Sequence, residues 1–341
     1  MAVLEGEENE PESVIDPSEY ELKDTKKLII DSDTAGDDAM AIMMAAKCPQ
    51  IDLLGVTVLP GNVDMKQALA NALMTLEVAK CDAPVYAGSE TFLTGEVPST
   101  FSIFGKDGMG DSDIIHPTRK AEEGSGIDFI IDTIKKNPGQ IEIVELGPCT
   151  NLALAIRKAP DVMKNVKKLW IMGSAGQGEG NATPVAEFNV YKDAEAVKVV
   201  LESGIPITFV GWDLAVDNRT YFYYDDMLRL ADTSEEGKFM MKAFTKLADN
   251  KLQQYGQYYI DLADPIAMAA CIWPDYITSY KSCYAYCCTD TENMPVYGQV
   301  VFFDKDKTYD AKFEIPPANC ELSSSQKADE FVERIIELLS R

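Results

Sequence analysis

Short apolar runs and longer amphipathic segments alternate along the chain from about residue 26. KKLIID at 26–31 and QIEIVELG at 140–147 are short segments whose apolar residues are typical of buried strands. DDAMAIMMAAKC at 37–48 has the length and composition of a helix, with carboxylates in its first turn. Strands that alternate with helices in this way predict an α/β fold. We expect a mostly parallel central sheet with helices on both faces, an open sheet of Rossmann-like type.

The same alternation predicts further strands and helices up to about residue 212, and the pattern then changes. Beyond residue 220, a helical region at 236–273 is expected to contain Pro265, followed by strands at 283–290 and 298–304 and a closing helix at 326–341. The C-terminal third therefore adds helices and short strands to the sheet. Residues 1–25 are acidic and lack periodicity, which predicts a disordered tail before a single domain at 26–341.

Composition narrows the classes of partner. The chain has 341 residues and is 46% hydrophobic, enough to bury one large core. Its net charge of −25 argues against nucleic acid and anionic membranes as partners, because phosphate groups would be repelled. The eight cysteines form no CxxC pair, so a zinc ribbon is not expected. No segment resembles a signal peptide or a membrane span, and we expect a cytoplasmic protein.

An acidic cluster lies between the first predicted strand and the first predicted helix. Asp31, Asp33, Asp37 and Asp38 fall within IIDSDTAGDDAMAI, residues 29–42. Helix capping explains one or two of these residues but not four. An EF-hand loop fits only in part, because Ala and Ile occupy its fifth and twelfth positions. An aspartyl-phosphate phosphatase with Asp31 as its nucleophile stays open, although the expected threonine comes one residue early.

A site for a hard cation explains the cluster better. Asp33 and Asp38 would supply oxygen ligands from the two ends of a tight turn, and a divalent ion would offset their repulsion. Further oxygen ligands can come from other strand ends. Asp264 in LADPIAM and a backbone carbonyl near Gly147 in VELGPCTN are the candidates.

Several sequence blocks resemble one enzyme family. DSDTAGDDAMAI is similar to the D-x-D-P-G-x-D-D-A signature of the nucleoside hydrolases, which cleave ribonucleosides to ribose and free base. VTVLPGNV, ELGPCTNLALA, GNATPVAEFNVYKDAEA, FVGWDL and ADP then follow in the order of that family's blocks. From about residue 26 to its C-terminus the chain is thus identified as a member of this family.

The resemblance implies a role for individual residues. Asp33, Asp38, Asp264 and the backbone carbonyl of Leu146 would bind Ca²⁺, and Asp33 would also be the general base for the attacking water. The residues implied to contact the substrate are Asp37, Asn62, Met172, Asn181, Glu187, Phe188 and Asn189. Asp31 would support the turn without touching the substrate. The family also implies a homodimer or homotetramer that binds a small ribonucleoside.

The chain departs from the family pattern at the positions that act on the departing base. Histidines that protonate the base in some members are replaced by Ala263 and by the aligned Phe104. The one histidine, His116, is expected to be a solvated loop residue. Aromatic residues could contact the base instead: Phe104, Tyr255, Tyr258 and Tyr259. We therefore expect a preference for purine ribonucleosides. A preference for pyrimidines or a broad specificity is one alternative, and a protein that binds nucleosides without turnover is another.

Overall fold

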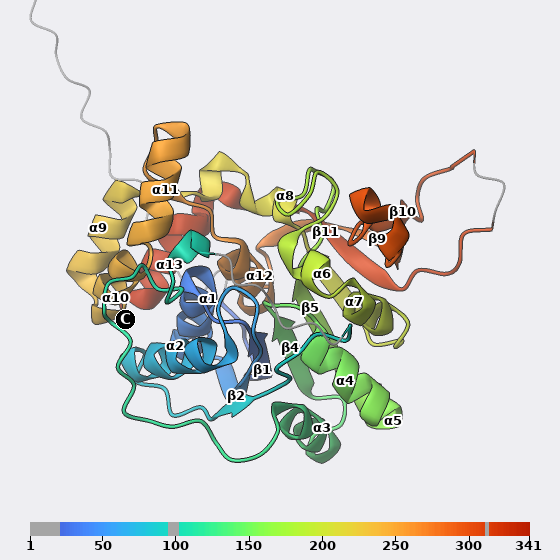
Figure 1. Cartoon of the computed structure of the whole chain (residues 1–341), viewed down its shortest axis with the longest axis horizontal. Helices are drawn as coiled ribbons and strands as arrows, with labels where there is room; N and C mark the ends of the chain where they lie inside the picture. The colour runs from blue at the N-terminus through green and yellow to red at the C-terminus, as the bar shows by residue number, and fades with distance from the viewer. Residues whose placement is uncertain (1–20, 95–101, 311–313) are drawn as a thin grey trace, which may run out of the picture.

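The computed structural model describes residues 21–94, 102–310 and 314–341. Within them, a nine-stranded sheet has the order β10-β9-β11-β6-β5-β4-β1-β2-β3 (Figure 1). Neighbouring strands are parallel from β11 to β3, whereas β9 pairs antiparallel with both β11 and β10. The strands are β1 (Lys26–Ser32), β2 (Ile51–Val58), β3 (Val85–Ala87), β4 (Ile141–Glu145), β5 (Lys168–Met172), β6 (Ile207–Val210), β9 (Ile277–Cys287), β10 (Val300–Asp304) and β11 (Cys320–Gln326). The mostly parallel sheet predicted from the sequence is confirmed.

Helices cover both faces of this sheet, as predicted (Figure 1). The main helices are α1 (Gly36–Lys47), α2 (Met65–Val78), α3 (Gly126–Lys136), α4 (Thr150–Lys158), α5 (Pro160–Met163), α6 (Phe188–Lys192), α7 (Ala194–Leu201), α8 (Trp212–Ala215), α9 (Tyr224–Thr233), α10 (Glu235–Ala243), α11 (Thr245–Tyr255), α12 (Ala263–Ile272) and α13 (Phe331–Leu339). A two-stranded sheet joins β7 (Phe222–Tyr223) to β8 (Tyr259–Ile260).

Strand β1 shows how the sequence pattern builds the two layers. Leu28 and Ile30 are fully buried in one apolar cluster, which also contains residues of α1, α2 and α12. Ile29 points to the opposite face, where it joins a cluster with residues of α4 and α7. Successive side chains of a strand alternate between faces, so a strand covered on both sides must be continuously apolar. This explains why KKLIID lacks polar alternation.

The carboxyl ends of the central strands meet at one edge. β1 pairs in parallel with β4, and β4 pairs in parallel with β5. The turn after β1, the loop after β4 and the loop after β5 therefore lie together. This edge is where open α/β sheets bind their ligands.

The C-terminal third differs from the sequence predictions in three places. CELSSSQ forms β11 inside the main sheet, although its serines gave no apolar pattern. The closing helix accordingly begins at Phe331 and not at residue 326. The predicted helical region at 236–273 is three helices and the short strand β8, with Pro265 in the first turn of α12. A proline there is tolerated because first-turn N–H groups have no partner within the helix.

The predicted tail at 1–25 lies mostly outside the described residues. Of the part that is described, Glu21 forms an ion pair with Arg341 near the C-terminus. Among the described residues, no helix is long and apolar enough to cross a membrane.

Candidate active site

The turn between β1 and α1 is fixed by Asp38. One of its carboxylate oxygens accepts a hydrogen bond from the Ala35 N–H at 2.9 Å, and the other accepts one from the Ser32 hydroxyl at 2.8 Å. Each bond joins the Asp38 side chain, in the first turn of α1, to the segment that leads into this helix. The turn therefore holds the neighbouring aspartates in defined positions.

Three carboxylates converge beside this turn. Asp37, Asp38 and Asp264 each offer an oxygen atom within 4.8 Å of the oxygens of the other two. Burial raises the pKa of Asp38 to about 6. It also raises the pKa of Asp264 well above its usual range, and the charges of Asp37 and Asp38 add to this effect. A cation bound among these oxygens would remove that repulsion.

Asp33 is buried next to this group without being part of it. Its Oδ2 atom accepts a hydrogen bond from the Asn62 N–H at 2.5 Å, whereas its Oδ1 atom has no hydrogen-bond partner among the described residues. Burial raises the pKa of Asp33, and the charge of Asp38 adds to the shift. An unpartnered buried carboxylate oxygen is costly and needs a ligand. Hard cations prefer such oxygen ligands, so the residues present fit a divalent ion.

The loop before α6 is tied to the ends of β4 and β5. Glu187 caps α6 by accepting hydrogen bonds from the N–H groups of Asn189 at 2.8 Å and Val190 at 3.1 Å. Burial raises the pKa of Glu187 to about 7. The Asn189 amide donates to the carbonyl of Leu146 at 2.8 Å. That carbonyl keeps a second lone pair, which could bind a cation.

A cavity of about 940 Å³ opens above these groups. It brings together most of the residues predicted from the sequence: Asp37, Asn62, Phe104, Leu146, Met172, Asn181, Glu187, Phe188, Asn189, Tyr255, Tyr259 and Asp264. Asp33 and Asp38 do not line the cavity but are buried beside those that do. The sequence blocks named above, far apart along the chain, thus converge on one site.

Two residues singled out from the sequence lie elsewhere. Tyr258 does not line the cavity, because its ring packs edge-on against Tyr224 at 5.2 Å between centroids. His116 faces solvent in its loop and pairs with Asp113 at 3.1 Å, as expected of a solvated histidine. Neither side chain belongs to the wall of the cavity.

Asp31 is not placed to act as a nucleophile. It is fully buried and accepts hydrogen bonds from the Thr57 hydroxyl and, at 2.8 Å, from the Asn151 amide. It does not line the cavity. The aspartyl-phosphate alternative required an accessible Asp31, so the structure argues against it.

Sequence reasoning missed part of the cavity wall. Trp212, Tyr221, Lys251 and Asp261 also line it. Trp212 lies in the block FVGWDL, which could have indicated it. The other three belong to segments without a recognisable motif.

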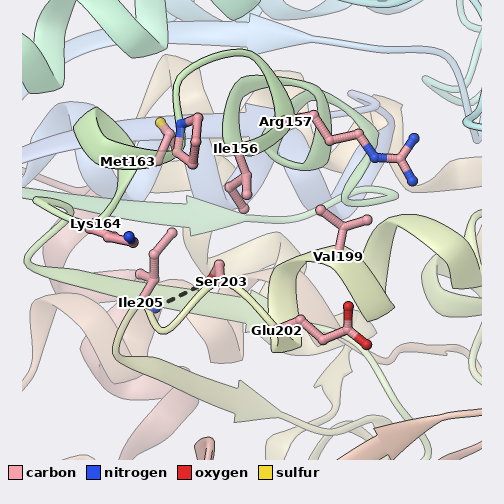
Figure 2. A pocket seen from close by; sticks show the side chains of 9 residues that line it. Ile156, Arg157, Met163, Lys164, Val199, Glu202, Ser203 and Ile205 are labelled. Carbon is pink, nitrogen blue, oxygen red and sulfur yellow. Dashed lines mark hydrogen bonds between the residues drawn. The ribbon is translucent and has the colours of Figure 1, made fainter.

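A second hollow is unrelated to the carboxylates. It has a volume of about 440 Å³ and lies among α4, α5 and α7 (Figure 2). Figure 2 shows apolar side chains such as Ile156 and Val199 beside Arg157 and Glu202. It contains none of the residues singled out above, so the larger cavity is the candidate active site.

The fold and the site define a class of protein. Buried carboxylates able to hold a cation, at the carboxyl ends of parallel strands and beside a large cavity, are the arrangement of a hydrolytic enzyme that activates water. The sequence profile of the family described as inosine-uridine preferring nucleoside hydrolase matches residues 28–333. The chain belongs to this family.

Relatives and solved structures agree with this assignment. The chain is 38% identical over 259 residues to uridine nucleosidase 1 of Arabidopsis thaliana, covering 75% of this chain and 76% of the relative. It is 35% identical over 281 residues to the pyrimidine-specific ribonucleoside hydrolase RihB of Escherichia coli, covering 81% and 87%. The plant nucleoside hydrolase PpNRh1 superposes with a TM-score of 0.84 at 33% identity, covering 92% and 99%. A purine-preferring ribonucleoside hydrolase from Gardnerella vaginalis superposes with a TM-score of 0.83 at 28% identity, covering 92% and 98%.

Family membership decides between the classes of function. The protein is a nucleoside N-ribohydrolase, an enzyme that hydrolyses the bond between ribose and base. The aspartyl-phosphate phosphatase is no longer needed as an explanation of the acidic cluster.

Proposed function

We propose that the protein is a calcium-dependent hydrolase of ribonucleosides that prefers purine nucleosides and serves nucleoside salvage. One observation carries the proposal. The buried carboxylate group of Asp37, Asp38 and Asp264 opens, through Asp37 and Asp264, into a cavity lined with amide and carboxylate side chains. This arrangement supports a cation and a polyhydroxylated ligand side by side.

The proposed ligands of Ca²⁺ are the side chains of Asp33, Asp38 and Asp264 and the carbonyl of Leu146. Carboxylate and carbonyl oxygens suit this ion, which accepts six to eight oxygen ligands. When bound, the ion neutralises the carboxylates and makes water a better acid. Because Asp33 Oδ1 has no hydrogen-bond partner in the part of the chain that the structure describes, it can take the proton of the attacking water.

The substrate-facing residues are proposed to hold the ribose. Asp37, Asn181, Glu187 and Asn189 would bind its hydroxyl groups, and Asn62, Met172 and Phe188 would line the reacting face. Cleavage of a glycosidic bond passes through an oxocarbenium-like transition state, whose positive charge nearby carboxylates stabilise. A substrate that lacks a hydroxyl leaves buried polar groups unpaired, so 2′-deoxyribonucleosides should be poor substrates.

The preference for purines rests on the size and the aromatic character of the cavity. Phe104, Tyr255 and Tyr259 line a space of about 940 Å³, which is ample for a bicyclic base. A pyrimidine or broad preference is the second candidate. The names of the Arabidopsis and E. coli relatives, which refer to uridine and to pyrimidines, favour it. The homo-oligomeric state and the cytoplasmic location stay predictions.

A set of parallel incubations tests the proposal. The purified protein is given Ca²⁺ and, separately, adenosine, guanosine, inosine, cytidine, uridine and 2′-deoxyinosine, and the released sugar and base are quantified. We expect inosine and guanosine to release base at rates well above the rate for uridine. Release from 2′-deoxyinosine should be slower by orders of magnitude. Asp33→Ala is the matched variant and should release nothing measurable. Faster cleavage of uridine and cytidine would replace the purine preference by the pyrimidine one.

A further inference from the structure

One positively charged side chain lines the cavity, and neither the sequence motifs nor the proposed ribose contacts explain it. Of the described residues that line the cavity, only Lys251 carries a positive charge. It lies on α11 and not on the loops that follow β1, β4 and β5. Its position matters because the family histidines that activate the departing base are replaced here by Ala263 and Phe104, and both replacements line the same cavity.

Lys251 is held in place by a carboxylate. Its Nζ atom donates to the Oδ2 atom of Asp261 at 2.6 Å, and the two side chains are 17% and 7% exposed. Asp261 lies between β8 and α12, three residues before Asp264. The pair therefore joins the wall formed by α11 to the segment that carries the proposed calcium ligand. A largely buried ion pair of this kind restricts the rotamers of the Lys251 side chain.

Two aromatic rings flank the ammonium group. Nζ lies 5.3 Å from the ring centre of Tyr259 and 5.7 Å from that of Tyr255. Tyr221 stacks on Tyr259 with 4.3 Å between centroids and 14° between planes, which extends the aromatic wall. Flat rings beside a donor and an acceptor suit a planar heterocycle whose edge carries an acceptor next to an N–H group. A nucleobase has such an edge, whereas ribose has not.

We propose that Lys251, held by Asp261, binds the base of the nucleoside and stabilises the negative charge that the base acquires as it departs. This inference rests on the proposed ribonucleoside hydrolysis. In that reaction the bond from the sugar carbon to the base nitrogen breaks, and its electron pair stays on the base. The attacking water adds hydroxide to the sugar carbon and gives its proton to Asp33. Asp33 then returns a proton to solvent, and the base takes one up from solvent.

Throughout this reaction Lys251 acts through its positive charge and passes no proton to the base. A fixed donor aimed at a developing anion lowers the barrier without being consumed. Lys251 thus takes over the electrostatic part of the role of the missing histidines, and Asp261 is a positioning residue.

Two substrates separate this role from a structural one. Inosine has a leaving group that needs help, whereas p-nitrophenyl riboside releases a stable phenolate anion that needs none. Lys251→Met should lower kcat for inosine about a hundredfold, the usual effect of removing one charge-stabilising donor. It should change kcat for p-nitrophenyl riboside less than about threefold, because the ribose and metal contacts are intact. Lys158→Met is the matched control, since Lys158 forms an exposed pair with Asp128 and does not line the cavity; it should leave both rates unchanged.

The outcomes distinguish the two claims. An equal loss of kcat on both substrates, or no loss on inosine, contradicts the role of Lys251. A wild-type protein that cleaves neither substrate contradicts the proposed function itself. If Lys251→Met does not fold, Lys251→Gln is measured in the same way, because it keeps a donor without the charge. A selective loss on inosine in that variant supports the role, and an equal loss on both substrates overturns it.

Discussion

Gly61 offers a sharp test of the position of Asp33. A Cβ atom added at Gly61 would lie 2.0 Å from the Asp33 Oδ2 atom and 2.8 Å from its Cγ atom. The φ angle of Gly61 is not positive, so alanine meets no backbone strain there. The substitution Gly61→Ala therefore acts through this one contact, and a glycine at position 61 is what allows the carboxylate to approach the backbone.

The size of the effect follows from the displacement. A Cβ atom essentially never lies within 3.0 Å of a non-bonded atom, so the carboxylate must move by about 1 Å. This movement would also disturb the hydrogen bond from the Asn62 N–H, which is 2.5 Å long. A misplacement of about 1 Å in a catalytic group typically costs about a hundredfold in rate. We therefore expect kcat to fall about a hundredfold, which corresponds to about 2.7 kcal/mol in the activation barrier.

Steady-state hydrolysis of inosine at saturating Ca²⁺ measures this loss, and thermal melting checks that the variant is folded. Gly173→Ala is the control, because its added Cβ atom would make only ordinary contacts at 3.4 Å. The reasoning is refuted if Gly61→Ala is folded and retains kcat within about threefold of the wild-type value. In that case, Asp33 does not need the position that the structure gives it.

Three further predictions concern charge, the leaving group and the support of the turn. Since the pKa of Glu187 is raised to about 7 and that of Asp38 to about 6, the chelated folded protein binds more protons than the unfolded chain between about pH 4 and 7. Its stability should therefore fall as pH rises through this window, so the gain in Tm on adding Ca²⁺ should grow from about pH 4 to about pH 7; a gain that shrinks would contradict this. His116→Ala should leave kcat for inosine almost unchanged, because the side chain is 68% exposed and outside the cavity; a tenfold loss would make the histidine catalytic. Asn71→Leu should lower the free energy of unfolding in urea by about 1–3 kcal/mol, because the Asn71 amide donates to the buried Thr34 carbonyl at 2.9 Å; an unchanged midpoint would contradict that support.

The fold was predictable where a strand is covered by helices on both faces. Leu28, Ile29 and Ile30 must all be apolar, because each contacts one of two cores. Strand β11 could not be predicted in this way. Its Ser323 is fully buried although it is polar, and the strand is held by pairing with β9 and, in parallel, with β6. Such pairing depends on tertiary neighbours that a local pattern does not contain.

The candidate site was predictable where motifs follow strand ends. Asp37, Leu146 and Asn189 come from three separate blocks, and parallel pairing brings those blocks to one edge. The wall that faces the base is different. Lys251 and Tyr221 reach the cavity from α11 and from the segment before β7, and their positions depend on how these segments pack over the sheet. Residues of this kind carry no local signature and emerge only from the structure.

The central claim is that the buried carboxylates hold one cation on which ribonucleoside hydrolysis depends. The most direct measurement is the initial rate of ribose release from inosine as a function of free Ca²⁺, starting from fully chelated protein. The account predicts a rate near zero without the ion, which rises to saturation as one ion binds per chain, and no such rise in Asp264→Asn. A rate that is already maximal in the chelated protein would contradict the claim.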